Sequence, residues 1–144
     1  MQNKLDNSES CHAKWMTKVL VAAALYNACF GVLAGLAPKM TLTWLGFLDP
    51  SSREQALWQC IGMIVGVYGV AYWFAARAPL RHWPVVLAGL LGKLFGPIGF
   101  VSSAANGVMP WRTGFIILSN DIVWWIPFSL ILIASARVHK RIAE

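Results

Sequence analysis

Four long apolar stretches, separated by short polar or proline-containing segments, dominate the hydrophobic pattern of the chain. They cover residues 18–37, 56–76, 82–105 and 111–136. Each is close to the roughly 20 residues that an α-helix needs to cross the hydrocarbon core of a bilayer. Because short connections favour antiparallel neighbours, the pattern predicts an all-α fold, an antiparallel four-helix transmembrane bundle in residues 15–137.

The segments outside these spans are a polar tail at each end and one amphipathic connection. Residues 1–14 are polar and mixed in charge, so we expect a disordered or loosely held cytoplasmic tail, and residues 138–144 are predicted to form a basic one. Pro38 ends the first span, since proline cannot continue a helix. Residues 41–55, "TLTWLGFLDPSSREQ", then combine large apolar side chains with turn formers. This combination predicts a short interfacial segment between the first and second helices.

Composition and charge indicate a protein whose main partner is the lipid bilayer. Hydrophobic residues make up 58% of the chain and charged residues 12%, about half the usual charged share of a soluble domain. The two tails and the second loop hold Lys4, Lys14, Lys18, Arg77, Arg81, Arg137, Lys140 and Arg141. The other two loops hold Lys39, Arg53 and Arg112. Since positive charge collects on the cytoplasmic side, both termini are predicted to be cytoplasmic.

The net charge of +6 is therefore explained by membrane topology. We expect no nucleic-acid partner, because no basic face with interleaved aromatic residues occurs outside the spans.

Polar side chains lie near the middle of all four predicted helices. Counting 1.5 Å per residue from the tryptophans that mark the interface places Tyr68, Lys93 and Asp121 each about 15 Å deep. Asn27 lies near the same plane on the first helix. Lys93 and Asp121 are also placed symmetrically about residue 107, in the turn between the third and fourth helices. They should therefore come level in an antiparallel hairpin.

Two opposite charges at one depth predict an ion pair. A lone charge at the bilayer centre costs at least about 2.5–3.5 kcal/mol, and a partner on the neighbouring helix offsets that cost. We therefore predict a Lys93–Asp121 pair, supported by Asn120, Asn27 or Tyr68. The pair is either a structural contact that fixes helix register or the centre of a functional site, and both interpretations stay open.

Pro97 adds a second irregular feature beside the lysine. Proline cannot donate a hydrogen bond to the carbonyl four residues earlier, which here is the carbonyl of Lys93. A kink and a free hydrogen-bond acceptor are therefore expected at Lys93.

Three of the predicted helices contain a GxxxG spacing. The glycines are Gly31 and Gly35, Gly62 and Gly66, and Gly92 and Gly96. Small residues at this spacing let two helix backbones approach closely. The pattern predicts tight packing at these faces, within the chain or between copies.

The sequence contains no pattern of catalytic or metal-ligating residues. Cys11, Cys29 and Cys60 lack the spacing of a zinc or redox motif, so we expect small buried apolar side chains there. His12 and His139 lie outside the spans and His82 is the first residue of one, so no pair is placed to hold a haem within the bundle. We expect no metal ion, cofactor or catalytic residue, and an enzyme ranks third among the functional hypotheses.

The layout resembles the DoxX-like group of small four-helix bacterial inner-membrane proteins: a first span, a proline, a short "WLGF" segment and three closely spaced spans. The stretches "LWQCIGMIVGVYG", "RHWPVVLAGLLGKLFGPIGF" and "NDIVWWIPF" are similar to an uncharacterised family of bacterial membrane proteins. This similarity covers most of residues 15–135 and implies a multi-pass protein of the bacterial inner membrane. Some DoxX-like proteins are associated with quinone-linked or thiol-redox complexes, and this chain lacks the cysteine pairs that would support such chemistry.

Two functional hypotheses follow. In the first, the protein binds a small or lipophilic ligand, or relays protons, at a mid-membrane polar cluster. The cluster consists of Lys93, Asp121, Asn120, Asn27 and Tyr68. In the second, the chain is a non-catalytic subunit or packing partner of a larger membrane complex, or a homo-oligomer, held by the glycine faces and the interfacial tryptophans.

Overall fold

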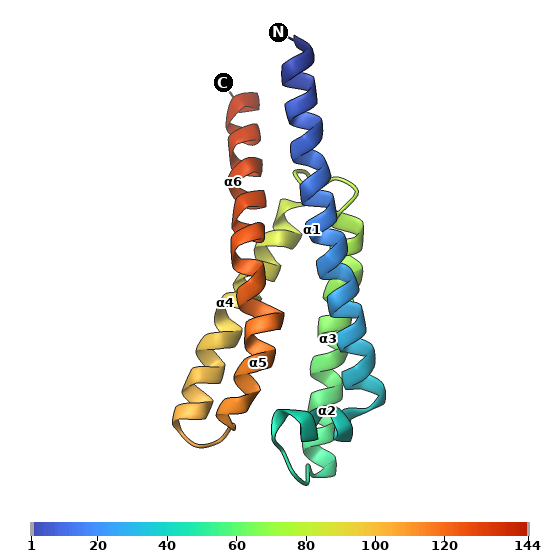
Figure 1. Cartoon of the computed structure of the whole chain (residues 1–144), viewed down its shortest axis with the longest axis vertical. Coiled ribbons are helices and arrows are strands. Elements are labelled where there is room, and N and C mark those ends of the chain that lie inside the picture. The colour runs from blue at the N-terminus through green and yellow to red at the C-terminus, as the bar shows by residue number, and fades with distance from the viewer. Residues whose placement is uncertain (1, 144) are drawn as a thin grey trace.

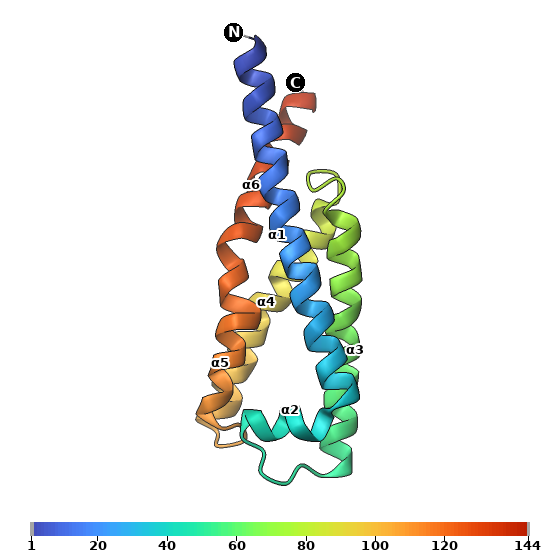
Figure 2. The ribbon, with the colours of Figure 1, turned by 45° about the vertical axis from the view of Figure 1, so that its right-hand side comes forward.

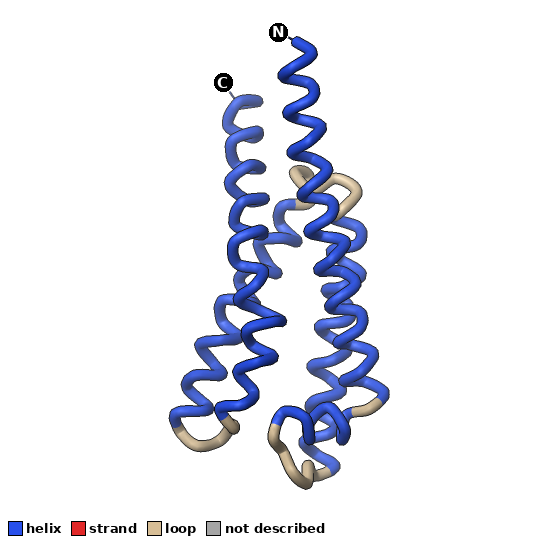
Figure 3. Tube along the Cα trace, in the orientation of Figure 1, coloured by secondary structure: helices blue, strands red, loops and turns tan. Residues whose placement is uncertain are grey.

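The structure is a computed structural model that describes the backbone of residues 2–143 and the side chains of residues 14–140. Within this part of the chain the residues form helices joined by loops, without a strand (Figure 3). The elements are α1 (Gln2–Leu36), α2 (Pro38–Leu45), α3 (Ser52–Ala75), α4 (Trp83–Ala105), the 3₁₀ turn η1 (Trp111–Thr113), α5 (Gly114–Ile117), the π-helical turn η2 (Leu118–Ile122) and α6 (Val123–Ala143). The predicted all-α fold is confirmed.

Four segments within the described residues are long and apolar enough to cross a membrane. They are Lys14–Leu36, Ser52–Ala75, Trp83–Ala105 and Trp111–Lys140. The last of these joins η1, α5, η2 and α6 into one rod. These segments agree closely with the four predicted spans, so the chain is a multi-pass membrane protein.

The bundle is built from two helical hairpins. α1 and α3 run side by side in both ribbon views, and α4 runs beside the α5–α6 rod (Figures 1 and 2). α1 begins and α6 ends at the same end of the bundle, whereas α2 lies across the opposite end (Figure 2). There Arg112 and Thr113 donate hydrogen bonds to the carbonyls of Thr43 and Leu45, at 3.1 and 2.9 Å. The first part of the predicted interfacial segment, residues 41–45, thus belongs to the short helix α2, which is hydrogen-bonded to the second hairpin.

Two glycine motifs face each other in the first hairpin. A Cβ atom at Gly31 would lie 2.8 Å from the carbonyl oxygen of Gly62 and from the Cα atom of Gly66. In the other direction, a Cβ atom at Gly62 would lie 2.6 Å from the Cβ atom of Ala34. The absence of side chains at these positions therefore lets the backbones of α1 and α3 come into direct contact, as GxxxG faces do in membranes.

The apolar core fills the half of the bundle nearest the chain ends. Its most buried large side chains are Met16, Leu20, Tyr72, Val86, Phe128 and Ile131. Tyr72 and Phe128 make an edge-to-face ring contact with 5.2 Å between centroids. Asn27, Lys93 and Asp121 are buried on the other side of this ring pair.

Two sequence expectations differ from the structure. The helices α1 and α6 continue through most of both expected tails, and neither segment contains a proline or glycine that would end a helix. Cys29 and Cys60 are exposed rather than buried, because an outward side chain of a membrane helix meets lipid instead of water. Cys11 lies outside the described side chains.

Candidate functional site

A cavity of about 190 Å³ lies where α1, α3, α4 and η2 meet near mid-length. We call it the central cavity. It is lined by Asn27, Ile64, Val65, Tyr68, Tyr72, Gly89, Gly92, Lys93, Asn120 and Asp121. All five polar residues predicted from the sequence are among them. At roughly 30 Å³ per water molecule, the space suits a few waters or one small polar group of a ligand.

The predicted ion pair is present at this cavity. The Nζ atom of Lys93 lies 3.8 Å from Oδ1 of Asp121, and the two side chains are only 7% and 8% exposed. Asn120 contacts both partners. Its backbone carbonyl accepts a hydrogen bond from Nζ of Lys93, and its Nδ2 donates to Oδ1 of Asp121 at 2.8 Å. Asn120 therefore stabilises both charged groups, in addition to their attraction for each other.

Both helices that carry the pair are irregular at this point. The carbonyl of Lys93, which Pro97 leaves without its helical donor, accepts a hydrogen bond from Nε1 of Trp125 at 2.9 Å. On the facing helix, residues 118–122 form a π-turn in which the N–H of Val123 reaches back to the carbonyl of Leu118. Such turns occur frequently at functional sites. They change which side chains point inward, and here Asn120 and Asp121 both lie in the turn.

Residues that line the cavity carry hydrogen-bonding groups that remain partly unused. Asn27 is only 2% exposed, and within the described residues neither its Oδ1 atom nor that of Asn120 accepts a hydrogen bond. The ammonium group of Lys93 has three N–H donors. Within the described residues its hydrogen-bond and ion-pair partners are Asn120 and Asp121, and it also lies 6.0 Å from the ring centroid of Trp124. Since an unsatisfied buried acceptor costs about 1–3 kcal/mol, these groups favour a polar occupant.

The central cavity opens sideways between α3 and α4. Ile64 and Gly92 line it and are also exposed, Ile64 to 60%. A Cβ atom at Gly92 would meet no described atom within 4 Å. The surface around this opening carries exposed apolar side chains such as Val67 and Phe95. We call the opening the lateral mouth, and at mid-length of the spans it faces hydrocarbon rather than water.

The third glycine motif consequently differs from the first two. Gly92 lies at the lateral mouth without a close neighbour, whereas a Cβ atom at Gly96 would lie 2.9 Å from Oδ2 of Asp121. Within the single chain, Gly96 makes room for a carboxylate and Gly92 packs against no helix. The packing role predicted for Gly92 stays a prediction for contacts between copies.

Sequence reasoning did not single out Tyr72 or Gly89. Tyr72 is 1% exposed, and a Cβ atom at Gly89 would collide with its hydroxyl group. Together they form the wall of the cavity toward the core. A signal was available, since Tyr72 follows Tyr68 by one helical turn and must share its face.

Trp125 offers a direct test of the hydrogen bond to the Lys93 carbonyl. Replacing Trp125 with phenylalanine removes the N–H donor and leaves that carbonyl unpaired. We expect the free energy of unfolding in detergent to fall by about 1–3 kcal/mol. Trp44→Phe is the matched control, because Trp44 is 65% exposed and its loss should have little effect. Equal stability of the two variants would contradict the assigned role.

Comparisons with family models, curated proteins and solved structures found no match to this chain.

Proposed function

We propose that the chain is an integral protein of the bacterial inner membrane that takes a small amphipathic molecule from the bilayer core into the central cavity. The observation that supports this most is the lateral mouth. A buried ion pair and two unused amide oxygens lie behind an opening at mid-span, lined by Ile64 and Gly92. A ligand that reaches them from hydrocarbon must itself be soluble in lipid.

The lining groups define the polar end of this ligand. An acceptor, such as a carbonyl oxygen, would bind the ammonium group of Lys93, and a hydroxyl or amide donor would bind the side-chain oxygens of Asn27 and Asn120. The ligand would be neutral, because Lys93 and Asp121 already balance one another and a third buried charge would be unpaired. Its apolar part would pass Ile64 and remain in the membrane.

Proton relay is the second candidate function of the same site. Lys93 and Asp121 are the ionisable side chains that line the cavity together with tyrosines, and the space beside them admits water. If the protein relays protons, liposomes that contain it should show a proton flux, and Asp121→Asn should abolish that flux. If the protein only binds a ligand, the liposomes should show no proton flux.

Membership of a homo-oligomer or a larger membrane complex is a separate proposal. Trp73 and Trp111 are 48% and 64% exposed. Exposed aromatic side chains near the ends of the spans could pack against a second chain. Sizing after extraction in mild detergent tests this proposal, and a particle with the mass of one chain would contradict it.

We further propose a DoxX-like relationship and an orientation with both termini in the cytoplasm. The orientation is supported by the cations Lys14, Lys18, Arg77, Arg81, Arg137 and Lys140, which belong to the end of the bundle where α1 begins and α6 ends. A reporter domain that is active only in the cytoplasm should be active when it is fused to the carboxyl terminus. A reporter domain that is active only outside the cytoplasm should be inactive there.

Gly92→Leu tests the ligand-binding proposal. The leucine side chain would extend into the lateral mouth without displacing packed atoms, so the fold should survive while the ligand is shut out. Wild-type protein is purified in mild detergent, and the small molecules that remain bound are identified by native mass spectrometry. We expect a neutral amphipathic molecule on the wild type and its loss from the variant.

Gly99→Leu is the matched control for this experiment. It adds the same side chain to the same helix at another glycine with open space around it, and it does not line the central cavity. This variant should keep the bound molecule. Equal occupancy in both variants, or a wild-type cavity that holds water alone, would refute the proposal.

A further inference from the structure

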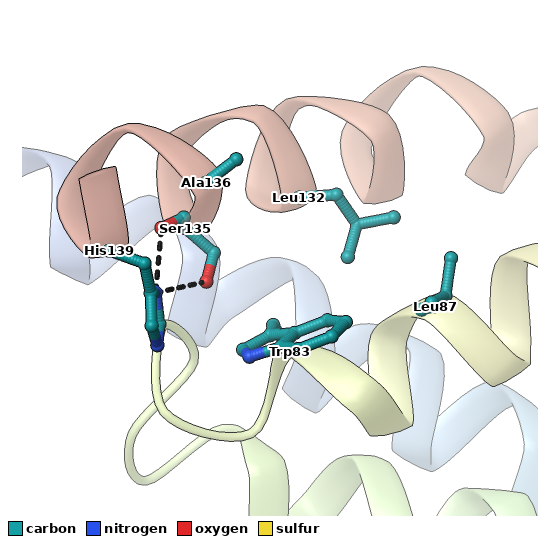
Figure 4. Close-up of a pocket in the computed structure, with 6 residues that line it drawn as sticks. All are labelled: Trp83, Leu87, Leu132, Ser135, Ala136 and His139. Atoms are coloured by element: carbon teal, nitrogen blue, oxygen red, sulfur yellow. Dashed lines mark hydrogen bonds between the residues drawn. The ribbon is translucent and has the colours of Figure 1, made fainter. Parts of the chain in front are cut away.

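A second cavity, of about 330 Å³, lies between the first turns of α4 and the last turns of the α6 span. We call it the chain-end groove. It is lined by Trp83, Leu87, Leu132, Ser135, Ala136 and His139, and none of these lines the central cavity. Figure 4 shows Ser135 and His139 at one end, Leu87 and Leu132 at the other and Trp83 between them. The volume falls within the range of about 300–1,000 Å³ that is usual for ligand sites.

The groove runs from a polar end to an apolar end along the helix axes. Leu87 is one turn farther into the membrane than Trp83, and Leu132 is two turns farther in than His139. Trp83 belongs to the first turn of its span, where tryptophans mark the membrane interface. The polar end therefore lies at the level of lipid head groups and the apolar end at the level of acyl chains.

The polar end is rigidly constructed. Ser135 is 2% exposed and donates a hydrogen bond to the carbonyl of Leu80 at 2.9 Å. Nδ1 of His139 donates to the carbonyl of Ser135 at 2.8 Å, since a carbonyl oxygen can only accept (Figure 4). The first bond holds the loop before α4 against α6, and Arg81 is the next residue of this loop after Leu80.

Two cations are close in the chain to residues at this end of the groove. Arg81 precedes Trp83 by two residues, and Lys140 follows Ala136 by one helical turn; both are exposed. The acidic side chains that the structure describes are elsewhere: Asp49 and Glu54 flank the start of α3 at the opposite end of the bundle, and Asp121 lies at the central cavity. An anionic group at the polar end would therefore meet cations and no described carboxylate.

We propose that the chain-end groove binds one anionic phospholipid. Its phosphate lies between Arg81 and Lys140, and one acyl chain passes Trp83 and packs against Leu87 and Leu132. The charge complementarity and the direction of the groove, from interface toward hydrocarbon, both select a lipid of the adjoining leaflet. This inference does not depend on the function of the central cavity.

Competition between two lipids tests the proposal. Purified protein is mixed with equal amounts of phosphatidylglycerol and phosphatidylcholine of the same acyl chains, and bound lipid is counted by native mass spectrometry. We expect wild-type protein to prefer phosphatidylglycerol. The double variant Arg81→Gln/Lys140→Gln should lose about fivefold in that preference for each cation removed.

Two further variants make the outcome decisive. Arg53→Gln/Lys39→Gln removes the same charge from the opposite end of the bundle and should leave the preference unchanged. Ala136→Trp fills the groove from its exposed edge and should remove the bound phosphatidylglycerol while every cation remains; its fold is checked by circular dichroism. Equal binding of the two lipids, equal behaviour of the two charge variants, or unchanged binding to folded Ala136→Trp would overturn the proposal.

Discussion

Replacing Lys93 with methionine is expected to lower the free energy of unfolding by about 3–5 kcal/mol, because the carboxylate of Asp121 would stay buried without its counter-charge. Asp121 is 8% exposed on its side chain, and its remaining hydrogen bond from Asn120 is neutral. Asp121→Leu should cost a similar amount, since it leaves the ammonium group of Lys93 unpaired. Reversible unfolding in mixed micelles or bicelles measures both effects.

The double variant Lys93→Met/Asp121→Leu separates the two interpretations of the pair. Because it removes both charges together, its stability should exceed that of either single variant. If the pair serves a ligand or a proton, the double variant folds but has lost that function. A double variant that loses the sum of the two single effects would show that the charges do not stabilise one another.

The exposed pair Lys39–Asp49 is the matched control. Its Nζ–Oδ1 distance is also 3.8 Å, but the side chains are 66% and 93% exposed. Surface pairs contribute about 0–1 kcal/mol, so Lys39→Met should change stability by no more than that. If Lys39→Met and Lys93→Met lowered the free energy of unfolding by similar amounts, burial would not determine the cost of removing one charge of an ion pair.

The large-scale arrangement could be predicted because it depends on simple lengths. Four apolar runs of spanning length define four helices, and short turns between them define antiparallel neighbours. Lys93 and Asp121 meet because they are equally far from the turn between their helices. That the carbonyl of Lys93 lacks its helical donor followed from Pro97 by the same kind of local rule, whereas its hydrogen bond from Trp125 did not.

Other features of the site could not be read from the chain because they depend on three-dimensional context. The π-turn at residues 118–122 has no residue signature, yet it places Asn120 and Asp121 together at the cavity. Gly92 has the same GxxxG pattern as Gly31. Among the described residues another helix packs against Gly31, whereas none packs against Gly92. A spacing shows that close approach is allowed, and only the neighbouring helix decides whether it occurs.

Gly31→Ala is expected to destabilise the first hairpin by about 1–3 kcal/mol, the usual cost of overpacking a close contact. The new methyl group would lie 2.8 Å from the Gly62 carbonyl oxygen and the Gly66 Cα atom, and neither can move aside as a flexible side chain would. α1 and α3 would have to separate. Since Asn27 lies one turn before Gly31, the separation should also widen the central cavity and weaken ligand binding.

Gly35→Ala supplies the comparison, because it is the second glycine of the same motif on the same helix. A Cβ atom at Gly35 would meet no described atom within 4 Å, so the substitution adds no collision and slightly favours the helix. The changes in the free energy of unfolding should therefore have opposite signs in the two alanine variants: a decrease for Gly31→Ala and a small increase for Gly35→Ala. Equal effects would mean that helix propensity rather than backbone contact governs α1, and the close α1–α3 packing that positions Asn27 would lose its explanation.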